Sequence, residues 1–421
     1  MLRSVQSMSV HLDPVSALLL DEAGLASPRS CSQGTDPLTV IPDSIRDLKS
    51  EPAALGTTLR DTTTLVIDDP ALANQLHAAG HSVRAYCDDL RDERGLAIAP
   101  LEALDEAALA GVELVLLRLP KSLGMLEDYA QRVAAFAAPG VRLLAGGREK
   151  HLTRGMNEVL ASSFGDVRAS LGRQKSRVLH AAAPTPGDLA WPHTTTLDDL
   201  TLVSHAGVFA ADKLDGGTRL MLDALTTSPA ASSSLPAPSS SFPAPSSSFP
   251  RRRESPPAGT TGDPRLRGDD RGGRAVDLGC GTGALATWLA RQGYHTLAVD
   301  VSRAACASTR DTAAANDVRV ETQRADTLVQ PPASVDLVVC NPPFHRGTTK
   351  DSTPGFDLIR SAIPALAPDA EFWTVFNSHL PYLPFLRAEV GPTKVIARDR
   401  HYTVTRSRRA ATDRRSPQLD G

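Results

Sequence analysis

The chain has 421 residues, of which 41% are hydrophobic and 22% are charged, and this composition excludes a wholly disordered or fibrous protein. At about 150 residues per domain, the length predicts two or three domains. The net charge of −3 argues against a general binder of polyanions. An aromatic content of 4% argues against a protein that stacks many nucleic-acid bases.

Two further classes are unlike this sequence. No apolar run approaches the roughly 20 residues that a membrane span needs, so we expect no membrane association. The five cysteines form neither a C-x-x-C motif nor a Cys/His metal spacing. We therefore expect reduced thiols, no bound metal and a cytoplasmic location.

The first part of the chain changes from irregular to periodic. Prolines and glycines interrupt residues 1–60, and only residues 15–20 look periodic, so we interpret this segment as a loosely packed, poorly ordered arm. Strand-like apolar runs follow at residues 65–67, 82–87, 112–119 and 141–145, with helical patterns at 71–79 and 126–138. Such alternation predicts a mainly parallel sheet covered by helices, here over residues 61–190. Residues 167–180 are expected to add closing antiparallel strands.

A connector with its own structure is expected over residues 191–227, in which residues 220–225 can start a helix. The composition then changes abruptly. Residues 232–250 repeat a seven-residue unit (SSSLPAP, SSSFPAP, SSSFPRR), and Pro, Gly, Arg and Asp dominate up to residue 273. Such a segment cannot bury enough apolar surface to offset its ordering entropy, so we predict a disordered insert over 228–273. The amino-acid sequence of this insert resembles the translated dispersed repeats found in some bacterial genomes.

A second alternating region follows the insert. Strands are predicted at residues 275–278, 296–299, 318–322, 335–340, 371–377, 393–397 and 401–405. Helices are predicted between them at residues 284–292, 303–315 and 354–366. This is the pattern of one doubly wound α/β domain over residues 274–409. The polar tail over residues 410–421 is expected to fray.

The two alternating regions repeat one pattern, which indicates a duplication. Residues 71–80 match residues 284–293, with Ala-Leu-Ala at the start of each and Gly at the end. Residues 112–121 match residues 335–344 in the same way. The alternative is two unrelated α/β domains.

The differences between the two copies show which one carries polar chemistry. The second copy has the glycine-rich sequence DLGCGTG at residues 277–283, where the first has Asp-Asp-Pro at residues 68–70. The second also has Asn341 where the first has Arg118. We therefore expect the active site in the C-terminal half.

The glycine-rich segment closes a predicted strand and opens a helix. Gly279, Gly281 and Gly283 let the backbone turn sharply and approach a ligand, at the sheet edge where open α/β folds bind ligands. Ala284 stands where a dinucleotide fingerprint needs its third glycine, whereas D-x-G-x-G-x-G from Asp277 is typical of a loop that binds S-adenosylmethionine.

Two acidic residues extend this predicted cofactor site. Asp300 ends the second strand and is placed to accept hydrogen bonds from ribose hydroxyls. Asp326 follows the next strand and is placed to accept from an adenine amino group. The alternatives are a strand-end acid and a plain turn acid.

The segment Asn341-Pro342-Pro343-Phe344 follows another strand and carries the predicted catalysis. An amino group conjugated to a ring is a poor nucleophile, because its lone pair is delocalised. The side-chain oxygen of Asn341 and the carbonyl of Pro342 can accept its two N–H bonds and orient it. Rigid prolines hold the loop, Phe344 can stack on the target ring, and positioning supplies most of the rate.

These motifs resemble those of the bacterial ribosomal RNA guanine-N2 methyltransferases of the methyltransferase small group. The matches are VDLGCGTG, CNPPFH, HLPY at 379–382 and the segment at 205–225, while residues 118–127 favour the large-subunit type. The resemblance implies two tandem Rossmann-like class I methyltransferase domains, of which the N-terminal one is degenerate. It also implies S-adenosylmethionine as cofactor, ribosomal RNA or a ribosomal subunit as partner, and a monomer. Phe209 and Asp215 would lie near the cofactor or the target.

Local charge must supply RNA contacts in a chain of this net charge. Residues 394–415 are rich in Lys and Arg and are expected to meet phosphates, the alternative being a solvated basic tail. Three other functions stay open at this point. They are methylation of adenine N6, methylation of a protein glutamine amide, and a non-catalytic RNA-binding role of the fold.

Overall fold

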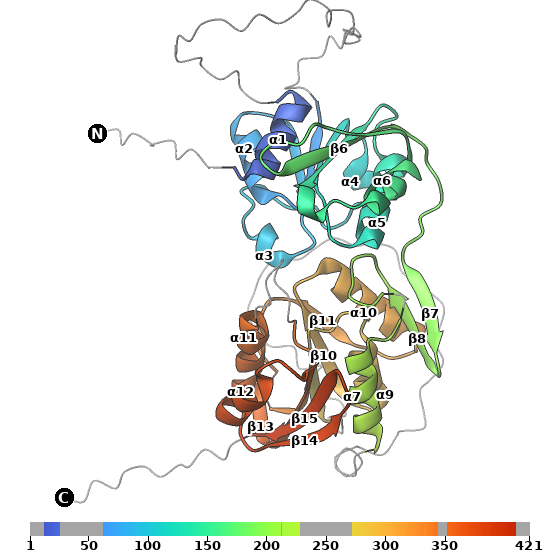
Figure 1. Cartoon of the computed structure of the whole chain (residues 1–421). Coiled ribbons are helices and arrows are strands. Elements are labelled where there is room, and N and C mark those ends of the chain that lie inside the picture. Colours follow the sequence, from blue (N-terminus) through green and yellow to red (C-terminus); the bar gives the residue numbers. More distant parts are fainter. Residues whose placement is uncertain are drawn as a thin grey trace, which may run out of the picture. The chain divides into compact units, whose positions relative to one another are not determined.

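The computed structural model describes residues 12–25, 62–211, 213–227, 272–332, 334–343 and 352–409. The chain divides into two compact units, Met1–Ala190 and Trp191–Gly421, and this division coincides with the expected boundary after residue 190 (Figure 1). The predicted tail, Phe344, most of the predicted arm and nearly all of the predicted insert lie outside the described residues.

The first unit contains a six-stranded sheet in the order β2-β1-β3-β4-β6-β5. The first four strands pair in parallel, and β6 pairs antiparallel with both β4 and β5, as predicted for the closing strands. The strands are β1 (Thr64–Ile67), β2 (Val83–Tyr86), β3 (Leu114–Arg118), β4 (Arg142–Arg148), β5 (Phe164–Ala169) and β6 (Ser176–Pro184).

Helices cover both faces of this sheet, because successive side chains of a strand point to opposite faces. Leu65 and Ile67 of β1 face a core with α5 (Leu123–Phe136) and α6 (Arg154–Ala161). Val66 faces a second core with α2 (Pro70–Ala78) and α1 (Pro14–Ala23) (Figure 1). The short helices α3 (Leu90–Glu93) and α4 (Glu106–Leu109) lie in the connections.

Helix α1 corrects one sequence interpretation. We expected residues 1–60 to form a loosely packed arm, but Asp13 caps a ten-residue helix with six buried residues. Leu19 is fully buried, and a Cβ atom on Gly146 of β4 would lie 2.8 Å from its Cγ atom. Asp13, Pro14 and Gly24 mark the ends of this helix in the sequence, but a helix of ten residues is marginal alone, so packing against β4 and β6 fixes it.

The second unit contains a seven-stranded sheet in the order β11-β10-β9-β12-β13-β15-β14. Strands β11 to β13 pair in parallel, and β15 pairs antiparallel with β13 and β14. The strands are β9 (Arg274–Leu278), β10 (His295–Asp300), β11 (Glu321–Arg324), β12 (Val335–Cys340), β13 (Leu366–Asn377), β14 (Thr393–Arg398) and β15 (Tyr402–Arg408). Strand β11 starts three residues later than predicted, because the N–H of Val318 still bonds back to Ala313 at the end of a helix.

The helices of the second unit also cover both faces. Helices α7 (Gly216–Thr227) and α9 (Ala284–Arg291) pack on one face, and α11 (Thr353–Ala362) and α12 (Tyr382–Glu389) on the other (Figure 1). Helix α10 (Arg303–Ala315) has the predicted bounds and packs beside α9, β10 and β11.

The expected connector contains a β-hairpin that the sequence analysis missed. Strands β7 (His193–Leu197) and β8 (Leu200–Ser204) pair antiparallel. The N–H of Val203 donates to Thr312 Oγ1 of α10 at 2.9 Å, and the N–H of Thr201 donates to Asn316 Oδ1 at 3.0 Å. The hairpin is therefore an integral part of the second unit.

The strand orders confirm the predicted internal repeat. The order β2-β1-β3-β4-β6-β5 recurs as β10-β9-β12-β13-β15-β14, with the same parallel and antiparallel pairs. Among the described residues of the first unit, strand β11 has no counterpart. An isolated parallel bridge from Ala85 to Pro100 stands at that edge instead.

Candidate active site

The glycine-rich loop lies where the sequence analysis expected it, between β9 and α9. Gly279, Gly281 and Gly283 have φ angles of 75°, 51° and 80°, a region that side chains other than glycine rarely adopt. The loop is fixed against β10, because the N–H groups of Gly279 and Cys280 donate to the Val299 carbonyl. At Gly283 a Cβ atom would lie 2.6 Å from the Cα of Thr309, so α10 packs directly against the loop.

Asp277 lies beneath this loop rather than on its surface. Its side chain is 1% exposed, and its Oδ2 accepts the N–H of Ala286 at 3.0 Å, in the first turn of α9. Burial is the main cause that raises the pKa of Asp277 to about 7, and the nearby Asp300 raises it further. The Oδ1 atom is buried without a hydrogen-bond partner. The predicted cofactor residue Asp277 thus acts on the loop from below.

Asp300 lies beside the loop at the carboxyl end of β10. Its Oδ2 accepts the N–H of Gly281 at 3.2 Å, and its Oδ1 accepts the N–H of Ser302 at 3.0 Å. Asp326 follows the neighbouring strand β11, and the two strands are in parallel register. Both acids are only partly buried, at the same sheet edge as the loop.

Asn341 and the two prolines leave the next strand, β12, directly beside the loop. Cys340 at the end of β12 pairs with Leu278 at the end of β9. A Cβ atom on Gly279 would lie 3.4 Å from the carbonyl oxygen of Asn341 and 4.0 Å from Pro343. The structure therefore brings the two predicted motifs into contact.

The amide of Asn341 is held by residues at the start of α7. Its Nδ2 donates to Asp215 Oδ2 at 3.0 Å and to Thr218 Oγ1 at 3.1 Å. A carboxylate only accepts hydrogen bonds, so the Nδ2 group must face Asp215 and the Oδ1 atom must face away from it. Among the described residues, no hydrogen bond occupies that Oδ1 atom.

Phe209 and Asp215, which were expected near the cofactor or the target, lie in different surroundings. Phe209 is 65% exposed, and it is the neighbouring Val208 whose Cγ1 would lie 3.9 Å from a Cβ atom on Gly281. Asp215 contacts Asn341, and none of its hydrogen bonds goes to the glycine-rich loop. Phe344 lies outside the described residues.

Thr218 and Tyr402 join the site without having been predicted. The hydroxyl of Tyr402 donates to Asp215 Oδ1 at 3.3 Å. Thr218 carries a local signal, because Asp-x-x-Thr is a helix-start pattern. Tyr402 carries none, because it reaches Asp215 from a strand 187 residues away in the chain.

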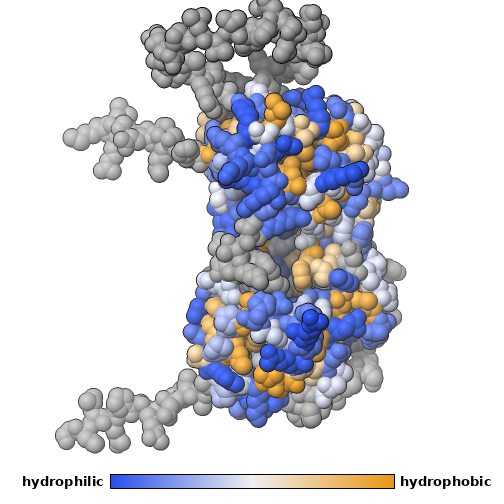
Figure 2. All heavy atoms as spheres, in the orientation of Figure 1, coloured by the Kyte–Doolittle hydropathy of each residue, from blue (hydrophilic) through white to orange (hydrophobic). Residues whose placement is uncertain are grey.

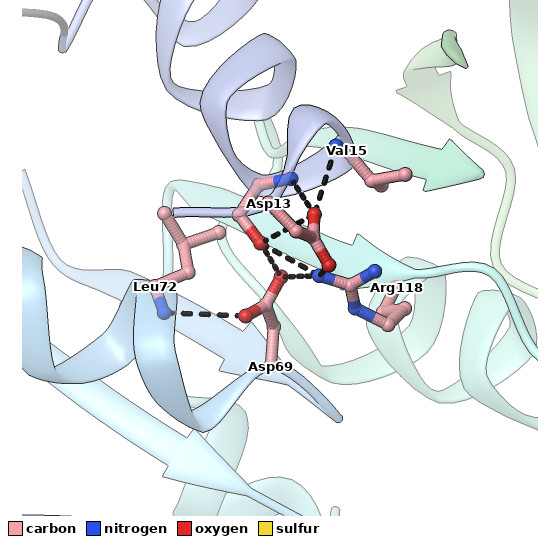
Figure 3. A network of polar contacts seen from close by, with 6 residues as sticks. Asp13, Val15, Asp69, Leu72 and Arg118 are labelled. Atoms are coloured by element: carbon pink, nitrogen blue, oxygen red, sulfur yellow. Dashed lines mark hydrogen bonds and ion pairs between the residues drawn. The ribbon is translucent and has the colours of Figure 1, made fainter. Parts of the chain in front are cut away.

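The corresponding place in the first unit is filled by protein side chains. Arg118, at the end of β3, donates from Nη2 to Asp69 Oδ2 at 2.8 Å and pairs with Asp13 at 2.9 Å (Figure 3). Asp69 is 2% exposed and also accepts from Ser16 at 2.7 Å. The five-residue loop of the second unit is reduced to Asp68 and Asp69 between β1 and α2, so this connection has no glycine-rich loop.

Comparisons with known proteins agree with this architecture. Residues 265–406 match the methyltransferase small domain, and residues 53–185 match the RLMG N-terminal domain. The ribosomal RNA large subunit methyltransferase G of Streptomyces avermitilis is 32% identical over 311 residues, which cover 70% of this chain and 71% of that protein. The chain belongs to the ribosomal RNA large subunit methyltransferase G family. The family member of Pseudomonas syringae pv. tomato is 30% identical, covering 84% of this chain and 89% of its own.

A solved structure supports the fold of this methyltransferase. The 16S rRNA N2 methyltransferase RsmC of T. thermophilus, in complex with AdoMet and guanosine, matches with a TM-score of 0.63. The alignment covers 96% of this chain and 93% of that one at 20% identity. Both units therefore have the Rossmann-like methyltransferase fold, and the first unit is the degenerate copy.

The residues present fit S-adenosylmethionine, the cofactor that the sequence motifs predict and that is bound in the RsmC structure. Three glycines with positive φ leave the loop without side chains where a ligand must approach, and two partly buried acids lie at the same edge. Cys280 and Cys340, which lie beside the two motifs in the sequence, are buried, and burial raises the pKa of Cys340 well above its ordinary value. Within the described ranges, no cluster suited to a metal ion occurs, and no helix meets the length and hydrophobicity of a membrane span.

Proposed function

We propose that this protein transfers a methyl group to the exocyclic N2 amine of a guanine in large-subunit ribosomal RNA. The observation that carries the proposal is the Asn341 amide, held at the end of β12 beside the glycine-rich loop with its Oδ1 atom facing away from Asp215. The names of the 30–32% identical relatives support large-subunit RNA as the substrate. The fold relative RsmC is an rRNA N2 methyltransferase bound to guanosine, which supports a guanine N2 acceptor.

The roles of the chain's own residues follow from the electronic structure of the acceptor. The N2 lone pair is delocalised into the purine ring, so the amine is a poor nucleophile until its geometry is constrained. Asn341 Oδ1 and the Pro342 carbonyl accept its two N–H bonds, which directs the remaining lone pair toward the methyl donor. S-adenosylmethionine supplies an activated methyl group when bound, so positioning accounts for most of the rate enhancement.

The cofactor is held by residues at the sheet edge of the second unit. The glycine-rich loop lies at that edge, beside the carboxylates of Asp300 and Asp326. Asp300 is proposed to accept from the ribose hydroxyls and Asp326 from the adenine amine, in the roles that their sequence positions suggest. Asp277 keeps the loop in place from below.

RNA contact is proposed for the basic edge formed by β14 and the turn after it. Lys394, Arg398 and Arg400 are exposed there, and Arg408 is exposed at the end of the neighbouring strand β15. Arg408 and Arg406 pair with Glu371 at 3.5 and 3.4 Å. The residues Lys394, Arg398 and Arg400 therefore supply most of the positive charge that RNA can meet at this edge. Hydrophilic residues cover most of the visible face of each unit (Figure 2). Binding should weaken with salt, and a paired guanine must flip out of its duplex to reach Asn341.

A methyl-transfer assay tests the proposal. The full chain is incubated with isotope-labelled S-adenosylmethionine and unmethylated large- and small-subunit RNA, naked and assembled, and labelled nucleosides are identified by mass spectrometry. We expect N2-methylguanosine in large-subunit RNA, and we propose that the reaction takes place in the cytoplasm. The Asn341→Ala variant should show no turnover, although its affinity for the cofactor should be unchanged. Labelled N6-methyladenosine or a labelled protein amide would overturn the guanine assignment. Cofactor binding without any labelled product would support a non-catalytic role.

A further inference from the structure

Asp215 is the centre of a set of hydrogen bonds that ends on Asn341. Its Oδ2 atom accepts from Thr218 N at 3.0 Å and from Asn341 Nδ2 at 3.0 Å, and its Oδ1 accepts from the Tyr402 hydroxyl at 3.3 Å. The carboxylate therefore joins three elements, α7, β12 and β15. It is partly buried, and its distance from Asn341 is that of a direct hydrogen bond.

The glycines after Asp215 allow Tyr402 to lie against the first turn of α7. A Cβ atom on Gly216 would lie 3.1 Å from the Tyr402 ring, and one on Gly217 would lie 3.0 Å from it. Both distances are tighter than ordinary contacts, so any larger residue would displace the ring. The ring in turn keeps its hydroxyl within reach of the carboxylate.

The degenerate unit repeats this arrangement with a different residue at its end. Asp13 caps α1 as Asp215 caps α7, and Ser16 stands three residues later, as Thr218 does. Arg118 ends β3 as Asn341 ends β12, and it pairs with Asp13 at 2.9 Å and donates to Ser16 at 2.6 Å. Both copies therefore use an Asp-x-x-Ser/Thr helix start to hold the residue at the end of the central strand.

We infer that Asp215 is a positioning residue that fixes the Asn341 amide, with Nδ2 toward the carboxylate and Oδ1 toward the target amine. This inference rests on the proposed function. Without the carboxylate, Nδ2 keeps Thr218 Oγ1 as a partner, but a hydroxyl can donate as well as accept. The amide can then turn over and present its NH₂ group to an amine that needs an acceptor. A negative charge on the Nδ2 side also polarises the amide and strengthens Oδ1 as an acceptor. Asp215 thus acts on the acceptor through Asn341 and not on the cofactor.

Steady-state kinetics with the full chain, large-subunit RNA and S-adenosylmethionine test this role. Asp215→Ala should lower kcat by about 100-fold, the cost of a misplaced reacting group, with little change in the KM for RNA. Asp215→Asn keeps an oxygen acceptor but loses the charge, so it should lose about tenfold. Calorimetry should give unchanged affinity for S-adenosylmethionine in both variants. The matched control is Asp105→Ala, which removes an aspartate cap from α4 in the first unit and should keep kcat.

A double-mutant cycle separates positioning from a structural role. Because Asn341→Ala is expected not to turn over, its residual rate and that of the double variant are compared in single-turnover reactions with excess enzyme. If Asp215 acts through Asn341, the variant carrying both Asp215→Ala and Asn341→Ala should be no slower in this measurement than Asn341→Ala alone. Additive losses, a kcat of Asp215→Ala within about twofold of the parent, or a loss of cofactor affinity would each overturn the inference. A parent chain that forms no N2-methylguanosine would instead overturn the proposed function.

Discussion

The buried carboxylate of Asp277 predicts a specific dependence of stability on pH. Its pKa is raised from 3.8 to about 7, chiefly by burial and also by Asp300. Between about pH 4 and pH 7, the folded state therefore keeps Asp277 protonated, whereas the unfolded state has already lost this proton. Stability from this group is fully present below the unfolded pKa and is lost as pH rises through 7.

The size of the effect follows from the pKa shift. Each pH unit between the two pKa values is worth about 1.4 kcal/mol, so the free energy of unfolding should fall by about 2.5 kcal/mol between pH 5 and pH 8. Asp277→Asn resembles the protonated acid, because its oxygen can still accept from Ala286. The variant should therefore lack this part of the pH dependence and be more stable than the parent at pH 8.

Tryptophan fluorescence isolates the second unit for this measurement. The three tryptophans of the chain, Trp191, Trp288 and Trp373, all belong to that unit. Urea unfolding followed by fluorescence at pH 5, 6, 7 and 8 gives the slope for each variant. Asp68→Asn is the control, because the pKa of Asp68 is also raised to about 7 by burial but that residue lies in the first unit. Equal slopes for the parent and Asp277→Asn would refute the reasoning.

Three further predictions concern the glycine-rich loop, the first unit and the hairpin. Gly283→Ala should weaken S-adenosylmethionine binding at least about tenfold, as measured by calorimetry, because a backbone at φ 80° costs ~1–3 kcal/mol with a side chain and the new Cβ atom would meet Thr309. The control Gly140→Ala should have no effect, because its Cβ atom meets nothing within 4 Å. Arg118→Ala leaves Asp69 buried without its ion-pair partner and should destabilise the first unit by about 3 kcal/mol. Amide hydrogen exchange should become faster in β1 and β3, while the fluorescence transition of the second unit should not change. Asn316→Ala removes both hydrogen bonds to Thr201 and should raise exchange in the β7–β8 hairpin, and equal exchange would contradict that role.

Sequence reasoning succeeded where local signals decide the structure. Helix α10 has the predicted bounds because Ser302 caps its start and the chain turns at Asn316. The glycine-rich loop and the Asn-Pro-Pro segment were found because each follows an apolar strand, and parallel strands bring their carboxyl ends to one edge. Helix α1 and the β7–β8 hairpin were missed, because packing against distant elements fixes both.

The same distinction explains the placement of Asp215. The family resemblance implied a place near the cofactor or the target, and the partner of Asp215 is Asn341, 126 residues away in the chain. No local pattern shows such a contact. The sequence did carry one signal for this contact, in its internal repeat. The pattern D-x-x-S/T followed by leucines occurs at residues 13–20 and again at residues 215–222. Extending the repeat to residue 13 would have paired Asp215 with Asp13.

The comparison of the two units also explains why the candidate active site lies in the second unit. Both units keep the strand order, the helix start with its aspartate and the contact from that aspartate to the end of the central strand. What differs is the group at the contact and the length of the loop beside it. Asn341 leaves an oxygen for a ligand, whereas the Arg118 guanidinium can only donate and is neutralised within the protein by Asp13 and Asp69. An asparagine at residue 118 would not restore the site, because Asp69 and the shortened loop still occupy the place of the glycines.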